Sequence, residues 1–185
     1  MKIYFTASIT GKKHYEKNYR LIVNTLRSLG HKLILNHLFE RTAVEVWGQS
    51  EEIDKVFCKL LMGWLKECDL VIAEVTYPSI GVGFEIAFAL NKLKPVLALY
   101  SSEQPVPLLK GMEGDQLIIE RYEPENLKAS LKNLLKLLSE KIDTRFTLLL
   151  PTNIVSFLDE LSKKKKIPRS VFIRSLIERE MKGEK

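Results

Sequence analysis

The stretch Asp69-Leu70-Val71-Ile72-Ala73-Glu74 is the strongest strand pattern in the chain. Its interior is apolar without alternation, as is typical of a parallel strand that is buried on both faces. The next segment, residues 75–83, is rich in turn residues and opens a helical pattern that runs through Asn91. A buried strand that passes directly into a helix indicates an α/β fold.

The segments on either side repeat this alternation of strands and helices. We expect strands at 2–8, 32–37, 95–100 and 116–120, helices at 14–29, 51–67 and 124–140, and a loop at 38–49. The pattern predicts an α/β fold with a five-stranded parallel, flavodoxin-like sheet of order 2-1-3-4-5 and helices on both faces. In that order, ligands bind beyond the carboxyl ends of the first and third strands. The candidate site is therefore near residues 8–11 and 74–83.

Length and composition exclude several classes of protein. The chain has 185 residues, a length that suits one domain or one domain with a short appendage. Of these residues 45% are hydrophobic and 28% charged, which is typical of a globular protein. No apolar run is long enough to cross a membrane, and the start shows no signal-peptide pattern. Cys58 and Cys68 match neither a disulfide framework nor a zinc spacing. We expect a cytoplasmic protein with no metal, no cofactor and no membrane contact.

The positive charge is concentrated in the last part of the chain. Residues 1–143 carry 19 basic and 18 acidic side chains, whereas residues 144–185 carry 10 and 5. This difference predicts two domains, 1–141 and 142–185. A basic segment either binds a polyanion such as DNA or forms a solvated helix surface.

Small residues and one carboxylate follow the central strand. Ser79, Gly81 and Gly83 stand where the strand passes into a helix, so a hydroxyl and backbone N–H groups can face an anion there. Glu85 is expected in the first turn of this helix, pointing toward the pocket. The residue types alone leave two alternatives: an anion-binding helix start with one acidic side chain beside it, or a tight turn whose glutamate only complements the helix dipole.

Two separated motifs resemble those of the 2′-deoxynucleoside 5′-phosphate N-hydrolases, relatives of the nucleoside 2-deoxyribosyltransferases. The motifs are Lys2-Ile3-Tyr4-Phe5-Thr6-Ala7-Ser8-Ile9 and the segment Trp64–Glu85, and the similarity covers roughly residues 1–122. The resemblance implies cleavage of the N-glycosidic bond of a deoxynucleoside monophosphate, which yields a free base and deoxyribose 5-phosphate.

The resemblance also implies roles for individual residues. Glu85 would be the nucleophile or ion-pair stabiliser under the anomeric carbon, and Tyr4 would orient it. The nucleotide and its phosphate would be held by Ser8, Ile9, Thr10, Ser79, Gly81 and Gly83. His37 would touch the base or a neighbouring subunit, and a structural role is the alternative for this histidine.

The chain departs from the family pattern at two positions that matter. Leu61 stands where the family has a second catalytic Asp, and Thr10 where it has a phosphate-contacting Arg. Lys12, Lys13 or Lys110 are candidates for the missing positive charge. Loss of a general acid costs roughly 10²–10⁴-fold in rate. Two hypotheses stay open: an N-glycosidase of (deoxy)nucleoside monophosphates with impaired activity, or an inactive nucleotide sensor that regulates a DNA-binding tail.

The tail is similar to the ribbon-helix-helix family. Residues 145–150 are expected to form a strand that ends at Pro151, and Thr152 and Ser170 are expected to cap two helices. The resemblance implies that two copies pair their strands, so we expect a homodimer or larger homo-oligomer. It places Arg145, Thr147 and Leu149 toward DNA bases and Ser170 at a DNA phosphate, although Leu149 departs from the usual polar residue. A dimerisation or tetramerisation clip without DNA is the alternative.

Overall fold

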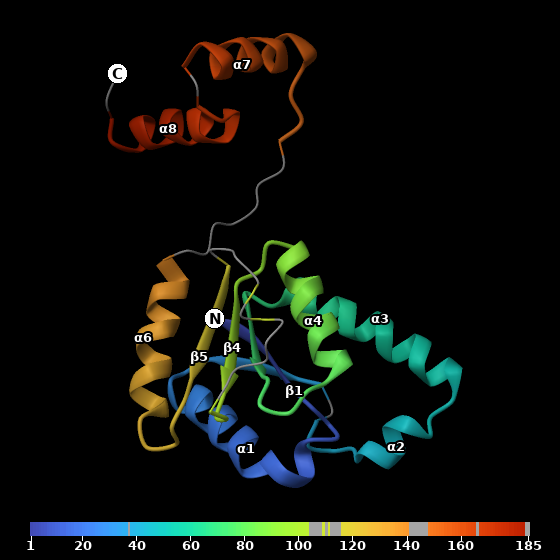
Figure 1. The fold of residues 1–185 in the computed structure, drawn as a ribbon. Helices are drawn as coiled ribbons and strands as arrows, with labels where there is room; N and C mark the ends of the chain where they lie inside the picture. The colour runs from blue at the N-terminus through green and yellow to red at the C-terminus, as the bar shows by residue number, and fades with distance from the viewer. Residues whose placement is uncertain are drawn as a thin grey trace. The chain divides into compact units, whose positions relative to one another are not determined.

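The structure is a computed structural model that describes residues 1–36, 38–103, 109, 111, 116–140, 148–165 and 167–183. Its internal contacts divide the chain into two compact units, Met1–Ile142 and Asp143–Lys185. The first unit is a parallel sheet with helices on both faces, and the second contains two helices (Figure 1).

The five strands of the first unit are parallel and lie in the order β2-β1-β3-β4-β5, which confirms the predicted sheet. Their bounds are β1 Lys2–Ala7, β2 Lys32–Leu35, β3 Leu70–Glu74, β4 Val96–Tyr100 and β5 Leu117–Arg121. β1 pairs with β3 in the register Ala7 to Glu74, so these two central strands end side by side. The loops that follow them start at the same edge of the sheet.

Helices α1 (Lys12–Ser28) and α6 (Leu127–Glu140) cover one face of the sheet. Alternate residues of the strands point toward them, because side chains of a strand alternate between its two faces. The buried cluster on this face includes Ile3, Phe5, Tyr19, Ile22, Leu70, Ile72, Leu97, Leu131 and Leu135.

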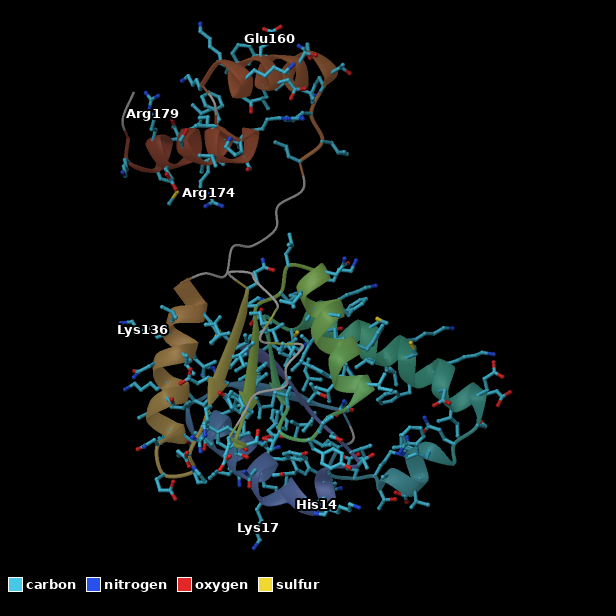
Figure 2. All side chains as sticks on the ribbon, viewed as in Figure 1. His14, Lys17, Lys136, Glu160, Arg174 and Arg179 are labelled. Carbon is cyan, nitrogen blue, oxygen red and sulfur yellow. The ribbon has the colours of Figure 1, made fainter. Side chains whose placement is uncertain are left out.

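Helices α3 (Glu51–Glu67) and α4 (Ile80–Asn91) cover the opposite face. The remaining strand residues pack there, and the cluster includes Tyr4, Leu61, Leu65, Val71, Ala73, Ile86, Val96 and Ala98. Side chains fill the space between the sheet and its helices (Figure 2). The prediction of helices on both faces is therefore confirmed.

The segment predicted as a loop at 38–49 contains a short helix, α2 (Ala43–Trp47), so that prediction was wrong. Thr42 and Glu45 form a capping box: the Thr42 hydroxyl accepts from Glu45 N, and the Glu45 carboxylate accepts from Thr42 N at 2.7 Å. A Thr followed three residues later by Glu is a helix-start signal.

The second unit contains α7 (Thr152–Lys165) and α8 (Arg169–Met181). Pro168, and not Ser170 as predicted, is the N-cap of α8, because the helix already begins at Arg169. The two helices are joined by an ion pair of 2.7 Å between Arg169 Nε and Asp159 Oδ1. Residues 148–150 are not in a strand, and residues 145–147 of the predicted strand lie outside the described residues. Within the described ranges, no helix is both long and apolar enough to span a membrane.

Candidate active site

A cavity of about 160 Å³ lies at the edge of the sheet where β1 and β3 end. Its wall comes from the β1 end, the segment after β2, α3 and the start of α4. The lining residues are Ala7, Ile9, Asn36, Leu38, Arg41, Val46, Gln49, Phe57, Ser79, Gly81, Val82 and Glu85. This is the position expected for a ligand site in a sheet of order 2-1-3-4-5.

Ser79 sets the start of the helix that carries the acidic residue of the cavity. It has an extended backbone, and its hydroxyl accepts a hydrogen bond of 3.4 Å from Val82 N as the N-cap of α4. Since α4 begins at Ile80, Glu85 lies in the second helical turn and not in the first as predicted. Its side chain is 6% exposed and lines the cavity.

Burial controls the protonation of Glu85. It raises the pKa of this carboxyl from 4.5 to about 7, and the Thr6 and Tyr4 hydroxyls lower it only in part. The Thr6 hydroxyl contributes to lowering this pKa, but neither Thr6 Oγ1 nor Glu85 Oε2 has a hydrogen-bond partner among the described residues. A buried carboxyl oxygen without a partner is costly, which is typical of a group whose partner is a ligand.

Tyr4 neighbours Glu85 and is held as a hydrogen-bond donor. Asn36 Nδ2 donates a hydrogen bond of 2.8 Å to Tyr4 Oη, so the phenol proton is available to the Glu85 carboxylate. Burial and the neighbouring carboxylate both raise the pKa of Tyr4. The phenol therefore stays protonated and can orient Glu85.

The loop after β1 is held against the loop after β3. Ser8 is buried, and its hydroxyl accepts a hydrogen bond of 3.1 Å from Gly11 N. A Cβ atom on Gly11 would lie 2.5 Å from Tyr77 Cβ, so only glycine permits this approach. The His14 ring stacks on Tyr77 with centroids 6.3 Å apart.

The residues predicted for the site fall into three groups. Ile9, Ser79, Gly81 and Glu85 line the cavity, and Tyr4 interacts with Glu85. Ser8, Thr10 and Gly83 lie on the same loops or helix but outside the lining. His37, Arg145 and Thr147 are outside the described residues, and Ser170 lies in the second unit.

Comparison with known proteins identifies the family. The family model described as nucleoside 2-deoxyribosyltransferase matches residues 3–146. The chain belongs to this family.

Similar proteins agree with this assignment, and a solved structure shares the fold. The chain is 38% identical over 124 residues to a protein of Syntrophotalea carbinolica named as a 2′-deoxynucleoside 5′-phosphate N-hydrolase, with 66% of this chain and 85% of that protein covered. It is 36% identical over 136 residues to the 5-hydroxymethyl-dUMP N-hydrolase of Mus musculus, covering 70% and 76%. A 2-deoxyribosyltransferase of Bacillus psychrosaccharolyticus shares the fold, with a TM-score of 0.53, 19% identity and coverage of 69% and 90%.

Leu61 is the residue that the resemblance places where a second catalytic Asp was expected. Its side chain is 7% exposed and packs in the same apolar cluster as Tyr4 and Leu65. An apolar side chain can neither donate a proton nor accept a hydrogen bond. Asp54, the nearest acidic residue before it on α3, accepts a hydrogen bond from the Gln49 side chain.

Sequence reasoning missed three polar residues that line the cavity. All three belong to the segment between β2 and α3: Arg41 and Gln49 were predicted in the loop 38–49, and Asn36 in the strand 32–37, which ends earlier, at Leu35. The predicted strand order could have indicated them. Because β2 lies beside β1 and runs parallel to it, the residues that follow β2 reach the same edge of the sheet as those that follow β1.

A second buried carboxyl, Glu74, ends β3 on the opposite face of the sheet. It accepts hydrogen bonds from Thr76 Oγ1 and, at 3.2 Å, from Tyr122 Oη. Burial raises its pKa to about 7. Among the described residues, no group of three or more His, Cys, Asp or Glu side chains is placed to bind a metal ion.

Proposed function

We propose that this chain hydrolyses the N-glycosidic bond of (deoxy)nucleoside 5′-monophosphates. The observation that carries the proposal is Glu85, a buried carboxyl that lines a cavity and keeps one oxygen without a partner among the described residues. Membership of the deoxyribosyltransferase family supports it, as do relatives that are named as nucleotide N-hydrolases.

In the proposed mechanism, Glu85 acts beneath the anomeric carbon of the sugar. The C1′–N bond breaks with its electron pair leaving on the base, and the carboxylate either stabilises the resulting oxocarbenium-like sugar or forms a transient ester with it. Water then supplies hydroxide to C1′, and its proton is taken up by the departing base. Tyr4 donates to the carboxylate and fixes its orientation.

The phosphate end of the substrate is proposed to lie at the start of α4. Ser79 and Gly81 line the cavity there, and a helix N-terminus favours an anion. The cavity of about 160 Å³ is smaller than the roughly 300–1,000 Å³ of typical ligand pockets. We therefore expect residues 41–49 to move outward when a whole nucleotide binds.

The absence of a second carboxylate is proposed to reduce the rate. With Leu61 in an apolar cluster, protonation of the base depends on water or on the base itself. Loss of a general acid costs roughly 10²–10⁴-fold. We expect slow hydrolysis, measurable in single-turnover experiments with excess protein.

The test is release of free base from each nucleoside monophosphate, separated by chromatography. Wild type should release base, and Glu85→Ala should release none above the rate without protein. The matched control is Glu52→Ala, which removes an exposed glutamate on α3. Equal rates for wild type and Glu85→Ala would contradict the proposal.

A second candidate function is an inactive nucleotide sensor joined to a DNA-binding ribbon-helix-helix module at residues 142–185. Leu61 supports it, and so does the second unit, in which Ile154, Phe157 and Leu176 are exposed and Leu158 is buried. An apolar face left exposed on a helix pair favours pairing with another copy. The basic side chains of α8 include Arg174 and Arg179 (Figure 2).

A gel-shift with the DNA upstream of the gene tests this candidate. A DNA-binding module should shift the fragment at low salt. Its affinity for the fragment should fall steeply as the salt concentration rises, because contacts to phosphate release counterions from the DNA. No shift at low salt would leave the tail as an oligomerisation clip only.

We also propose a homodimer or larger homo-oligomer through the first unit. The outer faces of α3 and α4 expose Ile53, Val56, Leu60 and Phe84, and Ile80 is 93% exposed. Large apolar side chains on adjacent helices are costly in water and favourable at an interface. Light scattering of residues 1–141 and of the full chain should give masses of at least two chains in both samples, and a monomeric mass for residues 1–141 would contradict an interface in the first unit.

A further inference from the structure

Arg41 contributes a positive charge to the lining of the cavity. Among the described residues that line the cavity, it alone is cationic, whereas Glu85 is acidic. It comes from the segment between β2 and α2, not from the first turn of α1, which holds Lys12 and Lys13, two of the candidates for the missing positive charge.

The backbone of Arg41 is fixed from outside the cavity. Lys12 Nζ donates a hydrogen bond of 3.0 Å to the Arg41 carbonyl oxygen. Lys12 therefore does not line the cavity itself but ties the first turn of α1 to the residue that does. This contact positions Arg41 relative to the loop after β1.

The guanidinium of Arg41 keeps most of its hydrogen-bonding capacity. One group, Nη2, donates to the Glu45 carbonyl at 3.3 Å, and a guanidinium has five N–H donors in all. The Glu45 carboxylate is engaged by Thr42 in the capping box. Arg41 also attracts the Glu45 carboxylate, although no ion pair joins the two among the described residues.

Charge balance in the cavity requires such a cation. A phosphate bound at Ser79 and Gly81 would share a small cavity with Glu85, and two anions in a poorly solvated space repel strongly. The helix N-terminus supplies only about half a positive charge. An arginine with several unused donors can bind phosphate oxygens in a bidentate way and offset the remainder.

We propose that Arg41 binds the 5′-phosphate of the substrate and determines the preference for nucleoside monophosphates over nucleosides. The inference deepens the proposed function and rests on it. The positive charge that the family pattern places at residue 10, here Thr10, is supplied instead from the segment after β2, and Lys12 acts as its positioning residue.

The experiment compares a monophosphate with the corresponding nucleoside as substrates. Arg41→Ala should lower kcat/KM for the monophosphate about 10- to 100-fold and change that for the nucleoside less than about twofold. Arg41→Lys should recover part of the loss, since it keeps the charge but not the bidentate geometry. The control is Arg121→Ala, which removes an arginine paired with Glu123 at the end of β5.

Two kinetic outcomes would overturn the assignment. An equal loss on both substrates would place Arg41 at the base or the sugar, and no loss on either would place it outside the bound substrate.

Equilibrium binding of deoxyribose 5-phosphate, measured by calorimetry, separates this inference from the proposed function. Wild type should bind it at least tenfold more tightly than Arg41→Ala even if neither protein hydrolyses nucleotides. Equal affinity, or no binding by either, would overturn the role of Arg41. Absence of hydrolysis with a retained difference in binding would overturn only the proposed function.

Discussion

Glu74 and Glu85 are two buried carboxyl groups at the same edge of the sheet, and they lie on its opposite faces. Glu74 ends β3 beside Tyr122, on the face that α1 and α6 cover, whereas Glu85 extends from α4 beside Tyr4, on the face that α3 and α4 cover. Burial raises the pKa of each to about 7. Of the two, Glu85 lines the cavity, so the first is expected to control stability and the second both stability and activity.

Glu74 should make the protein less stable as the pH rises. Its pKa is about 7 in the folded chain and 4.5 ordinarily, so the unfolded chain releases the proton first. The stabilisation is complete below about pH 4.5 and is lost as the pH rises to 7, by at most about 3 kcal/mol. Urea unfolding at pH 5 and pH 8 should show that Glu74→Gln changes the free energy of unfolding differently at the two values. An identical change at both would contradict the raised pKa.

Activity should increase as the pH rises, whereas the stability that Glu74 contributes should decrease. The reaction needs the Glu85 carboxylate, and its pKa in the free protein is about 7. We expect kcat/KM to rise about tenfold per pH unit below 7 and to level off above it. The measurement is base release from a monophosphate between pH 5 and 9. A profile that is flat between pH 5 and 7 would mean that Glu85 is not the titrating group.

Leu61→Asp should increase hydrolysis if the cavity is otherwise intact. The substitution places a carboxyl where the resemblance implies a second catalytic Asp, and a restored general acid is expected to give about 10²-fold or more. It should also lower stability by about 1–3 kcal/mol, because a polar group enters an apolar cluster. Leu61→Asn is the control, since an Asn side chain has nearly the shape of Asp but cannot act as an acid. Equal rates for both variants would show that the site works without that group.

Gly11→Ala should disturb the site without changing any polar group. The added Cβ would lie 2.5 Å from Tyr77 Cβ and 2.9 Å from Tyr19 Oη, so the loops after β1 and β3 must separate. We expect a loss of about 1–3 kcal/mol in unfolding free energy and a higher KM. Gly63→Ala is the control, because nothing lies within 4 Å of its Cβ on α3. Equal stability of the two variants would mean that the contact is unimportant.

The sequence was sufficient for the sheet because its strands are short and apolar and helices separate the first four of them. The run 70–74 is buried throughout, and the order of the strands follows from right-handed crossovers. The residues at the ends of β1 and β3, including Ser79 and Glu85, were found for the same reason. These features depend on local pattern and topology.

The parts of the site that sequence reasoning missed depend on contacts between distant segments. Arg41 reaches the cavity because Lys12 holds its carbonyl, and Gln49 lines it while bonded to Asp54. Neither contact leaves a periodic signal. The turn of Glu85 was misplaced because the Ser79 cap starts α4 earlier than the two glycines suggested.

The most direct test of Glu85 as the catalytic carboxylate is a crystal structure of Glu85→Gln with an intact deoxynucleoside monophosphate. The account predicts the residue 85 side chain beneath the sugar, within about 3–3.5 Å of C1′, with the phosphate at Ser79 and Arg41. A nucleotide bound elsewhere, or a sugar turned away from residue 85, would contradict it.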